Sequence, residues 1–155
     1  TFGEAFVKSQ LGAGTRLPRS GKVFLTVKNA DKPRAVSIAR DLAAMGFELL
    51  ATKGTAAAIA EAGVSVQVVN KVTEGRPHIV DMIKNDEIAM VINTVEERRN
   101  AIADSRAIRT SSLAARVTTF TTIFGAEAAG EGMKHLDTLD VYSVQELHAR
   151  LTAAA

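Results

Sequence analysis

The chain has 155 residues, of which 46% are hydrophobic and 23% charged, and this length and balance suit one soluble domain with a sizeable core. The net charge of +2 comes from scattered basic residues, and the 5% of aromatic residues include no tryptophan, which argues against a nucleic-acid binder. No apolar run approaches the ~20 residues of a membrane span, and the lack of cysteine excludes disulfides, thiolate metal sites and cysteine nucleophiles.

The expected helices and strands alternate along the chain. Residues 1–11 are expected to form a short helix, and residues 12–21, with three glycines and a proline, a linker. Short apolar runs rich in β-formers predict strands at residues 23–27, 49–52, 64–69, 88–92 and 117–120. Helical spacing of apolar residues, or bounding caps and glycines, predicts helices at residues 33–46, 55–62, 77–85, 104–115 and 123–134.

The helix boundaries rest on capping chemistry. Asp104 is expected to cap the helix that runs to Ala115. A last short strand is expected around Val141, followed by a helix over residues 143–151, which the capping-box pair of Ser143 and Glu146 would open.

Five strands alternating with helices predict an open, mostly parallel sheet with helices on both faces, a Rossmann-type α/β fold. In such sheets, ligands bind beyond the carboxyl ends of the strands, beside helix N-termini. Candidate binding residues are therefore sought in the loops that follow the strands.

The loop after the second strand has the composition of an anion site. It reads Thr52-Lys53-Gly54-Thr55, where Gly54 permits close backbone approach and the following helix offers free N–H groups. The alternative is a plain helix-capping turn, because short turns of threonine and glycine are common.

The loops after the third and fourth strands add compatible groups at the same edge. Lys71 could contact a phosphate as a point charge, and Asn93 with Thr94 could contact a base or a sugar. Lys32, at the start of the helix after the first strand, is a further cation. Taken singly, Lys71 is better explained as a solvated lysine, and Asn93 with Thr94 as a turn or N-cap pair. Their convergence on one edge of the sheet is what favours a phosphate site.

Motifs for other chemistry are missing. The sequence has no Gly-x-Gly-x-x-Gly after the first strand, no Walker-type loop and no nucleophile-elbow serine. The histidines, His78, His135 and His148, lack metal-ligand spacing. We therefore expect neither a catalytic residue nor a metal site, and no cofactor within this domain.

The loops described above resemble the methylglyoxal-synthase-like superfamily, and within it the C-terminal allosteric domain of the carbamoyl phosphate synthetase large subunit. The likeness runs from about Thr1 to the end, and its most specific part is Asn70-Lys71-Val72 followed by Glu74-Gly75-Arg76-Pro77-His78-Ile79. The other carrying stretches are residues 46–49, 51–55, 92–94 and 104–109.

The resemblance implies a parent enzyme that makes carbamoyl phosphate from bicarbonate, glutamine and ATP with magnesium, for pyrimidine and arginine biosynthesis. Residues 1–21 would then be a connecting helix and linker from the preceding catalytic region, and residues 22–155 the allosteric domain. A separate small glutaminase subunit would supply ammonia. The start at Thr1 without methionine fits a piece of a longer chain, and the lack of both cysteine and a signal peptide fits the cytoplasm.

The resemblance also implies effectors: UMP as inhibitor and IMP as activator at one site, and ornithine at a site shared with the catalytic part. The residues matching the family's phosphate contacts are Thr52, Gly54, Thr55 and Lys71. The residues matching the rest of the nucleotide pocket are Lys32, Lys53, Asn93 and Thr94. On this side of the ornithine site the matches are Asp104 and Thr121.

Two departures from the family pattern bear on function. Val95 stands where bacterial relatives often carry a second threonine, which affects nucleotide preference. The Gly-Gly-Asp run of true methylglyoxal synthases is missing after the third strand, where residues 70–75 stand instead. The alternatives that remain are an enzyme of the methylglyoxal synthase or IMP cyclohydrolase type, and a docking or homo-oligomerisation module with an empty pocket.

Overall fold

A computed structural model describes residues 1–96, 99–140 and 142–153. Its five strands form a single all-parallel sheet in the order β3-β2-β1-β4-β5, which confirms the predicted open α/β fold. The strands are β1 (Lys22–Thr26), β2 (Glu48–Ala51), β3 (Gln67–Val68), β4 (Met90–Asn93) and β5 (Thr118–Phe120). The chain moves outward from β1 to β3, and then returns to add β4 and β5 on the other side.

The strand register places several polar residues together at the carboxyl edge of the sheet. Thr26 at the end of β1 lies opposite Asn93 at the end of β4. On the other side of β1, Leu25 lies opposite Ala51, so that Thr52 follows directly at the same edge. The gap between β1 and β4 is the point where the strand order reverses, which is the usual ligand position in this class of fold.

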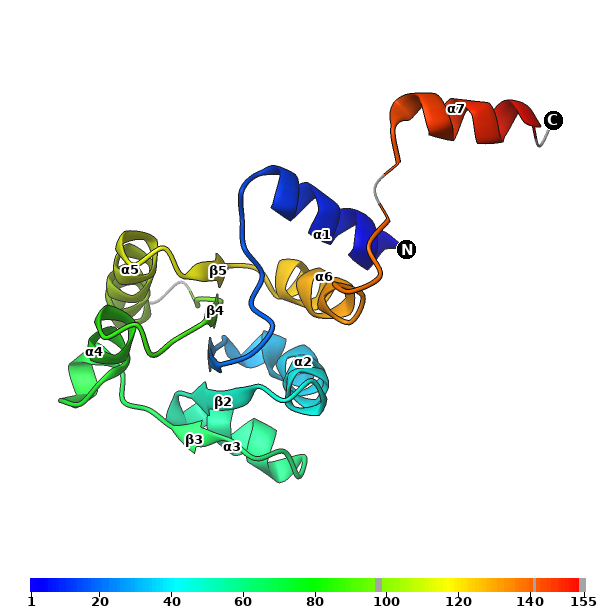
Figure 1. Ribbon diagram of the computed structural model, residues 1–155. Coiled ribbons are helices and arrows are strands. Elements are labelled where there is room, and N and C mark those ends of the chain that lie inside the picture. The colour runs from blue at the N-terminus through cyan, green and yellow to red at the C-terminus, as the bar shows by residue number, and fades with distance from the viewer. Residues whose placement is uncertain (97–98, 141, 154–155) are drawn as a thin grey trace.

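Helices cover both faces of the sheet (Figure 1). One face carries α1 (Phe2–Gly12), α2 (Lys32–Ala44), α3 (Lys53–Glu61) and α6 (Ile123–Met133). The other carries α4 (Ile79–Lys84) and α5 (Arg99–Ala114). The last helix, α7 (Val144–Ala153), extends away from this body in Figure 1. Within the described ranges, no helix is long and apolar enough to cross a membrane.

The core consists of two layers separated by the sheet. Val23 and Leu25 of β1 point into the layer under α2, α3 and α6, whereas Phe24 between them points into the layer under α4 and α5. All three side chains are fully buried. A parallel strand buried on both faces reads as a continuous apolar run, and this is why the strands could be recognised from sequence.

Three expected elements differ from, or fall outside, the structure. The third strand is shorter than residues 64–69, because β3 lies at the sheet edge and pairs only with β2. The prediction that Asp104 caps a helix is wrong: α5 begins at Arg99, because residues 99–103 contain no glycine or proline to stop it, and Asp104 lies inside the helix. The strand expected around Val141 falls on a residue outside the described ranges.

The capping box expected near the C-terminus is confirmed. The Glu146 backbone N–H donates to Ser143 Oγ at 3.1 Å, and the Ser143 backbone N–H donates to Glu146 Oε2 at 2.7 Å. The backbone hydrogen bond to the carboxylate lowers the pKa of Glu146 below its ordinary value, with the Ser143 hydroxyl adding to this.

Candidate functional site

A cavity of about 190 Å³ opens at the carboxyl edge of the sheet, between the ends of β1 and β4. It brings together every residue that sequence reasoning assigned to the nucleotide pocket except Lys53. Those residues are Lys32, Thr52, Gly54, Thr55, Lys71, Asn93 and Thr94. They come from four separate segments of the chain, which confirms that these segments converge on one edge of the sheet.

The N-terminus of α3 forms one wall of the cavity. Thr52 precedes the helix in an extended conformation, but its side chain does not cap it; its hydroxyl instead donates to Thr26 Oγ1 at 3.1 Å. Thr55 Oγ1 accepts from the Val27 backbone N–H at 3.2 Å. Both hydroxyls thus tie the helix end to β1, and the first-turn N–H groups of α3 are left without a side-chain cap. An uncapped helix N-terminus with its positive dipole end favours an anion.

Lys32 lies directly over this helix end. A Cβ added to Gly54 would stand 3.2 Å from Lys32 Nζ, so the ammonium group is close to the backbone of the first turn. An ammonium beside the positive end of a helix is unfavourable unless negative charge lies between them. The pair therefore suits a ligand that carries an anionic group.

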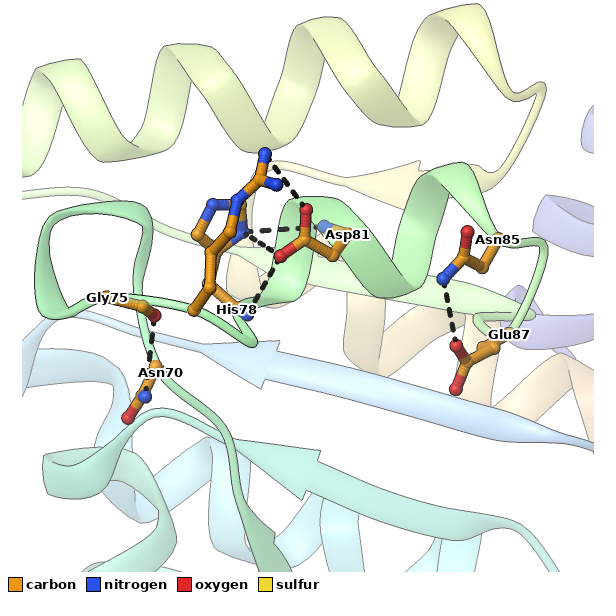
Figure 2. A network of polar contacts seen from close by, with 7 residues as sticks. Asn70, Gly75, His78, Asp81, Asn85 and Glu87 are labelled. Atoms are coloured by element: carbon orange, nitrogen blue, oxygen red, sulfur yellow. Dashed lines mark hydrogen bonds and ion pairs between the residues drawn. The ribbon is translucent and has the colours of Figure 1, made fainter.

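The loop between β3 and α4 brings Lys71 to the cavity, and its ends are fixed by local contacts (Figure 2). Asn70 Nδ2 donates to the Gly75 carbonyl at 3.5 Å, and Gly75 adopts φ 98°, a conformation that favours glycine. At the far end, His78 Nδ1 accepts from the Asp81 N–H at 3.4 Å, while Asp81 Oδ2 accepts from the His78 N–H at 3.3 Å. This reciprocal pair opens α4 and holds the loop that carries Lys71.

Lys53 lies apart from the cavity lining. Its side chain is 69% exposed and its Nζ lies 4.0 Å from Glu74 Oε1, in the same loop as Lys71. The Lys71 backbone N–H donates to the other oxygen of Glu74 at 2.9 Å. Glu74 thus contacts both lysines, and of the two only Lys71 lines the cavity.

The end of β4 and the adjoining turn of α5 form the opposite wall. Asn93 is 1% exposed, and its Nδ2 donates to Ser105 Oγ at 3.2 Å. Thr94 Oγ1 accepts from the Lys28 backbone N–H at 3.1 Å. Asp104 also lines this cavity and is largely buried.

The two residues matched to the ornithine site do not meet in one cavity. Asp104 lines the cavity between β1 and β4, whereas Thr121 is exposed and lines a separate groove beside β5. That groove also contains Arg16, Arg109 and Arg116.

Sequence reasoning missed several residues of the cavity. Thr26 is the last residue of β1, and the rule that ligands bind beyond strand ends was sufficient to find it. Ser105 and Ile108 line the cavity from α5, together with Asp104. They were missed because candidate residues were sought only in the loops that follow the strands. Among the residues that the structure describes, no three His, Asp or Glu side chains gather as a metal site would require.

Gly54→Ala is expected to weaken anion binding about tenfold, which corresponds to ~1.4 kcal/mol, without lowering the free energy of unfolding. The new Cβ would meet only the flexible end of Lys32, at 3.2 Å from Nζ and 3.9 Å from Cε, and would push the ammonium away from the helix end. Gly54 is the second residue of α3, where alanine is compatible with the helix. Phosphate titration and urea unfolding of both forms measure the two effects, and unchanged affinity would contradict the role of this turn.

The family model and two similar relatives point to the same family of proteins. Residues 34–121 match the family model described as MGS-like domain. The chain is 64% identical over 151 residues to the carbamoyl phosphate synthase large chain of Ralstonia nicotianae, and 55% identical over 151 residues to that of Pasteurella multocida. Each match covers 97% of this chain but only 14% of the relative.

A solved structure shares the fold. The crystal structure of methylglyoxal synthase from Elizabethkingia anophelis NUHP1 superposes with a TM-score of 0.58 at 21% identity. The match covers 72% of this chain and 77% of the other. This similarity is evidence for the architecture alone.

Proposed function

The chain belongs to the MGS-like domain family, and on that premise we propose that it is the regulatory, effector-binding domain of a carbamoyl phosphate synthase large chain. The observation that carries the proposal is the cavity between β1 and β4, where an uncapped helix end and two lysines meet a wall of hydroxyl and amide groups. The high identity to carbamoyl phosphate synthase large chains over 97% of this chain supports the choice of parent protein.

The ligands we propose are nucleoside monophosphates, with UMP as inhibitor and IMP as activator. The phosphate would lie on the N-terminus of α3, between Lys32 and Lys71, because these groups favour an anion. Asn93, Thr94 and the apolar Ile108 would contact the ribose and the base. An effector of this kind regulates by binding one conformation of the parent enzyme more tightly than another, typically by ~1–3 kcal/mol.

The proposed context is the cytoplasmic parent enzyme, which uses ATP with magnesium to make carbamoyl phosphate. The partners of this domain would be the catalytic region of the same large chain and, through it, the small glutaminase subunit. Ornithine would bind at the boundary with the catalytic region, with Thr121 as a contact from this side. The chain spans only 14% of the length of these relatives.

The alternative of a methylglyoxal synthase rests on the shared fold. Against it, residues 70–75 replace the Gly-Gly-Asp run that follows the third strand in such enzymes. The Asp104 carboxylate does line the cavity, but one of its oxygens accepts from Thr73 Oγ1 at 3.2 Å. We propose that this chain binds its phosphorylated ligand without transforming it.

Calorimetric titration of the full chain with UMP, IMP and inorganic phosphate tests the proposal. We expect both nucleotides to bind and to compete with each other, with phosphate as a weaker competitor for the same cavity. Titrations without heat at millimolar nucleotide would argue strongly against a nucleotide-binding module. Formation of methylglyoxal from dihydroxyacetone phosphate, measured by a colorimetric assay, would instead favour the enzyme.

A further inference from the structure

One buried carboxylate oxygen in the cavity lacks a protein partner. Asp104 is 8% exposed and lies inside α5, where it lines the cavity between β1 and β4. Its Oδ2 accepts from Thr73 Oγ1 at 3.2 Å, but its buried Oδ1 has no hydrogen-bond partner among the described protein groups. A buried acceptor left without a donor is costly, so such atoms are rare in folded proteins and need a specific explanation.

The contact with Thr73 fixes where Asp104 stands relative to the phosphate end of the cavity. Thr73 belongs to the same short loop as Lys71, two positions further along the chain, and both Lys71 and Asp104 line the cavity. Asp104 therefore lies close to the lysine proposed to hold the phosphate. A carboxylate repels a phosphate, so the ligand group beside it must be a donor. In a nucleoside monophosphate, the group joined to the phosphate is the ribose, whose hydroxyls are donors.

We propose that Asp104 accepts a hydrogen bond from a ribose hydroxyl through Oδ1 and so distinguishes a nucleotide from other phosphates. This deepens the proposed function and rests on it. Carboxylates bind ribose hydroxyls in other folds of the α/β class, where an acidic residue at the cavity edge accepts from the sugar. Asp104 then has a role within the nucleotide cavity, apart from Thr121 in the groove beside β5.

The test compares UMP with 2′,3′-dideoxyuridine 5′-monophosphate, which lacks both ribose hydroxyls, on the full chain and its D104N variant. We expect the unsubstituted chain to bind UMP about tenfold or more tightly than the dideoxy ligand, since a hydrogen bond to a charged group is of this size. In D104N, the affinity for UMP should fall by about the same factor, while that for the dideoxy ligand and for inorganic phosphate changes little. Asparagine keeps the shape of the side chain and can still accept from Thr73.

The matched control is Thr73→Val, which removes the hydrogen bond to Oδ2 but leaves Oδ1 in place. If Asp104 acts only by holding the loop, T73V will weaken UMP, the dideoxy ligand and phosphate by similar factors, while D104N, which keeps the contact with Thr73, will leave all three almost unchanged. That pattern overturns the inference. Equal binding of UMP and the dideoxy ligand by the unsubstituted chain overturns it too, even if D104N fails to fold. If the chain binds neither UMP nor phosphate, the proposed function fails and the inference fails with it.

Discussion

Gly132→Ala is expected to destabilise the chain by about 3 kcal/mol, the upper part of the range for overpacked cores. A Cβ at this position would stand 2.0 Å from Val7 Cγ2 and 2.4 Å from the Gly3 carbonyl oxygen. The first contact could be relieved by a side-chain shift, but the second involves the backbone of α1. Helix α1 would therefore have to move off α6, which would expose Val7, a fully buried side chain.

Gly130→Ala is the matched control for this prediction. Gly130 lies in the same helix, and a Cβ there would meet nothing within 4 Å. Because alanine is the better helix former, Gly130→Ala should raise stability by about 0.5–1 kcal/mol. Urea unfolding followed by circular dichroism measures both variants. Similar small effects from the two substitutions would show that α1 does not pack against α6 as described.

The packing of α1 on α6 illustrates what the sequence could not provide. A short helix was predicted over residues 1–11, but nothing local in the sequence indicated its packing partner. The contact depends on two glycines, Gly3 and Gly132, that lie far apart in the sequence and let the backbones approach. The strands were easier, because a continuous apolar run buried on both faces identifies a parallel strand without knowledge of its neighbours.

The sequence was sufficient to predict where the candidate site lies, but not to predict all the residues that line it. The rule for strand ends located the loops of Thr52, Lys71 and Asn93, because it depends only on topology. The rule could not show that Lys71 lines the cavity and Lys53 does not. The direction of a lysine side chain depends on contacts such as that of Lys53 with Glu74. Asp104 was misjudged because an aspartate before a helix and one inside it look alike when no glycine or proline marks the boundary.

Lys71→Ala is expected to weaken the binding of UMP and IMP by the same factor, about ten- to a hundredfold. Lys71 lines the cavity from a loop whose backbone is fixed at both ends, so the backbone is in place before the phosphate binds. Because the phosphate is common to both nucleotides, removing its contact cannot favour either. Calorimetric titration in about 0.1 M salt measures the loss, which should shrink as more salt screens the charge.

The control for charge alone is Lys84→Ala, which removes one positive charge from the exposed last turn of α4, outside the cavity lining. Its effect on UMP and IMP should be small, because Lys84 cannot contact a ligand in the cavity and salt at about 0.1 M screens the longer-range attraction between exposed charges. Loss of only one nucleotide in Lys71→Ala would place this lysine beside the base and not the phosphate. Equal losses in Lys71→Ala and Lys84→Ala would mean that long-range attraction, and no specific contact, brings the ligand to this edge of the sheet.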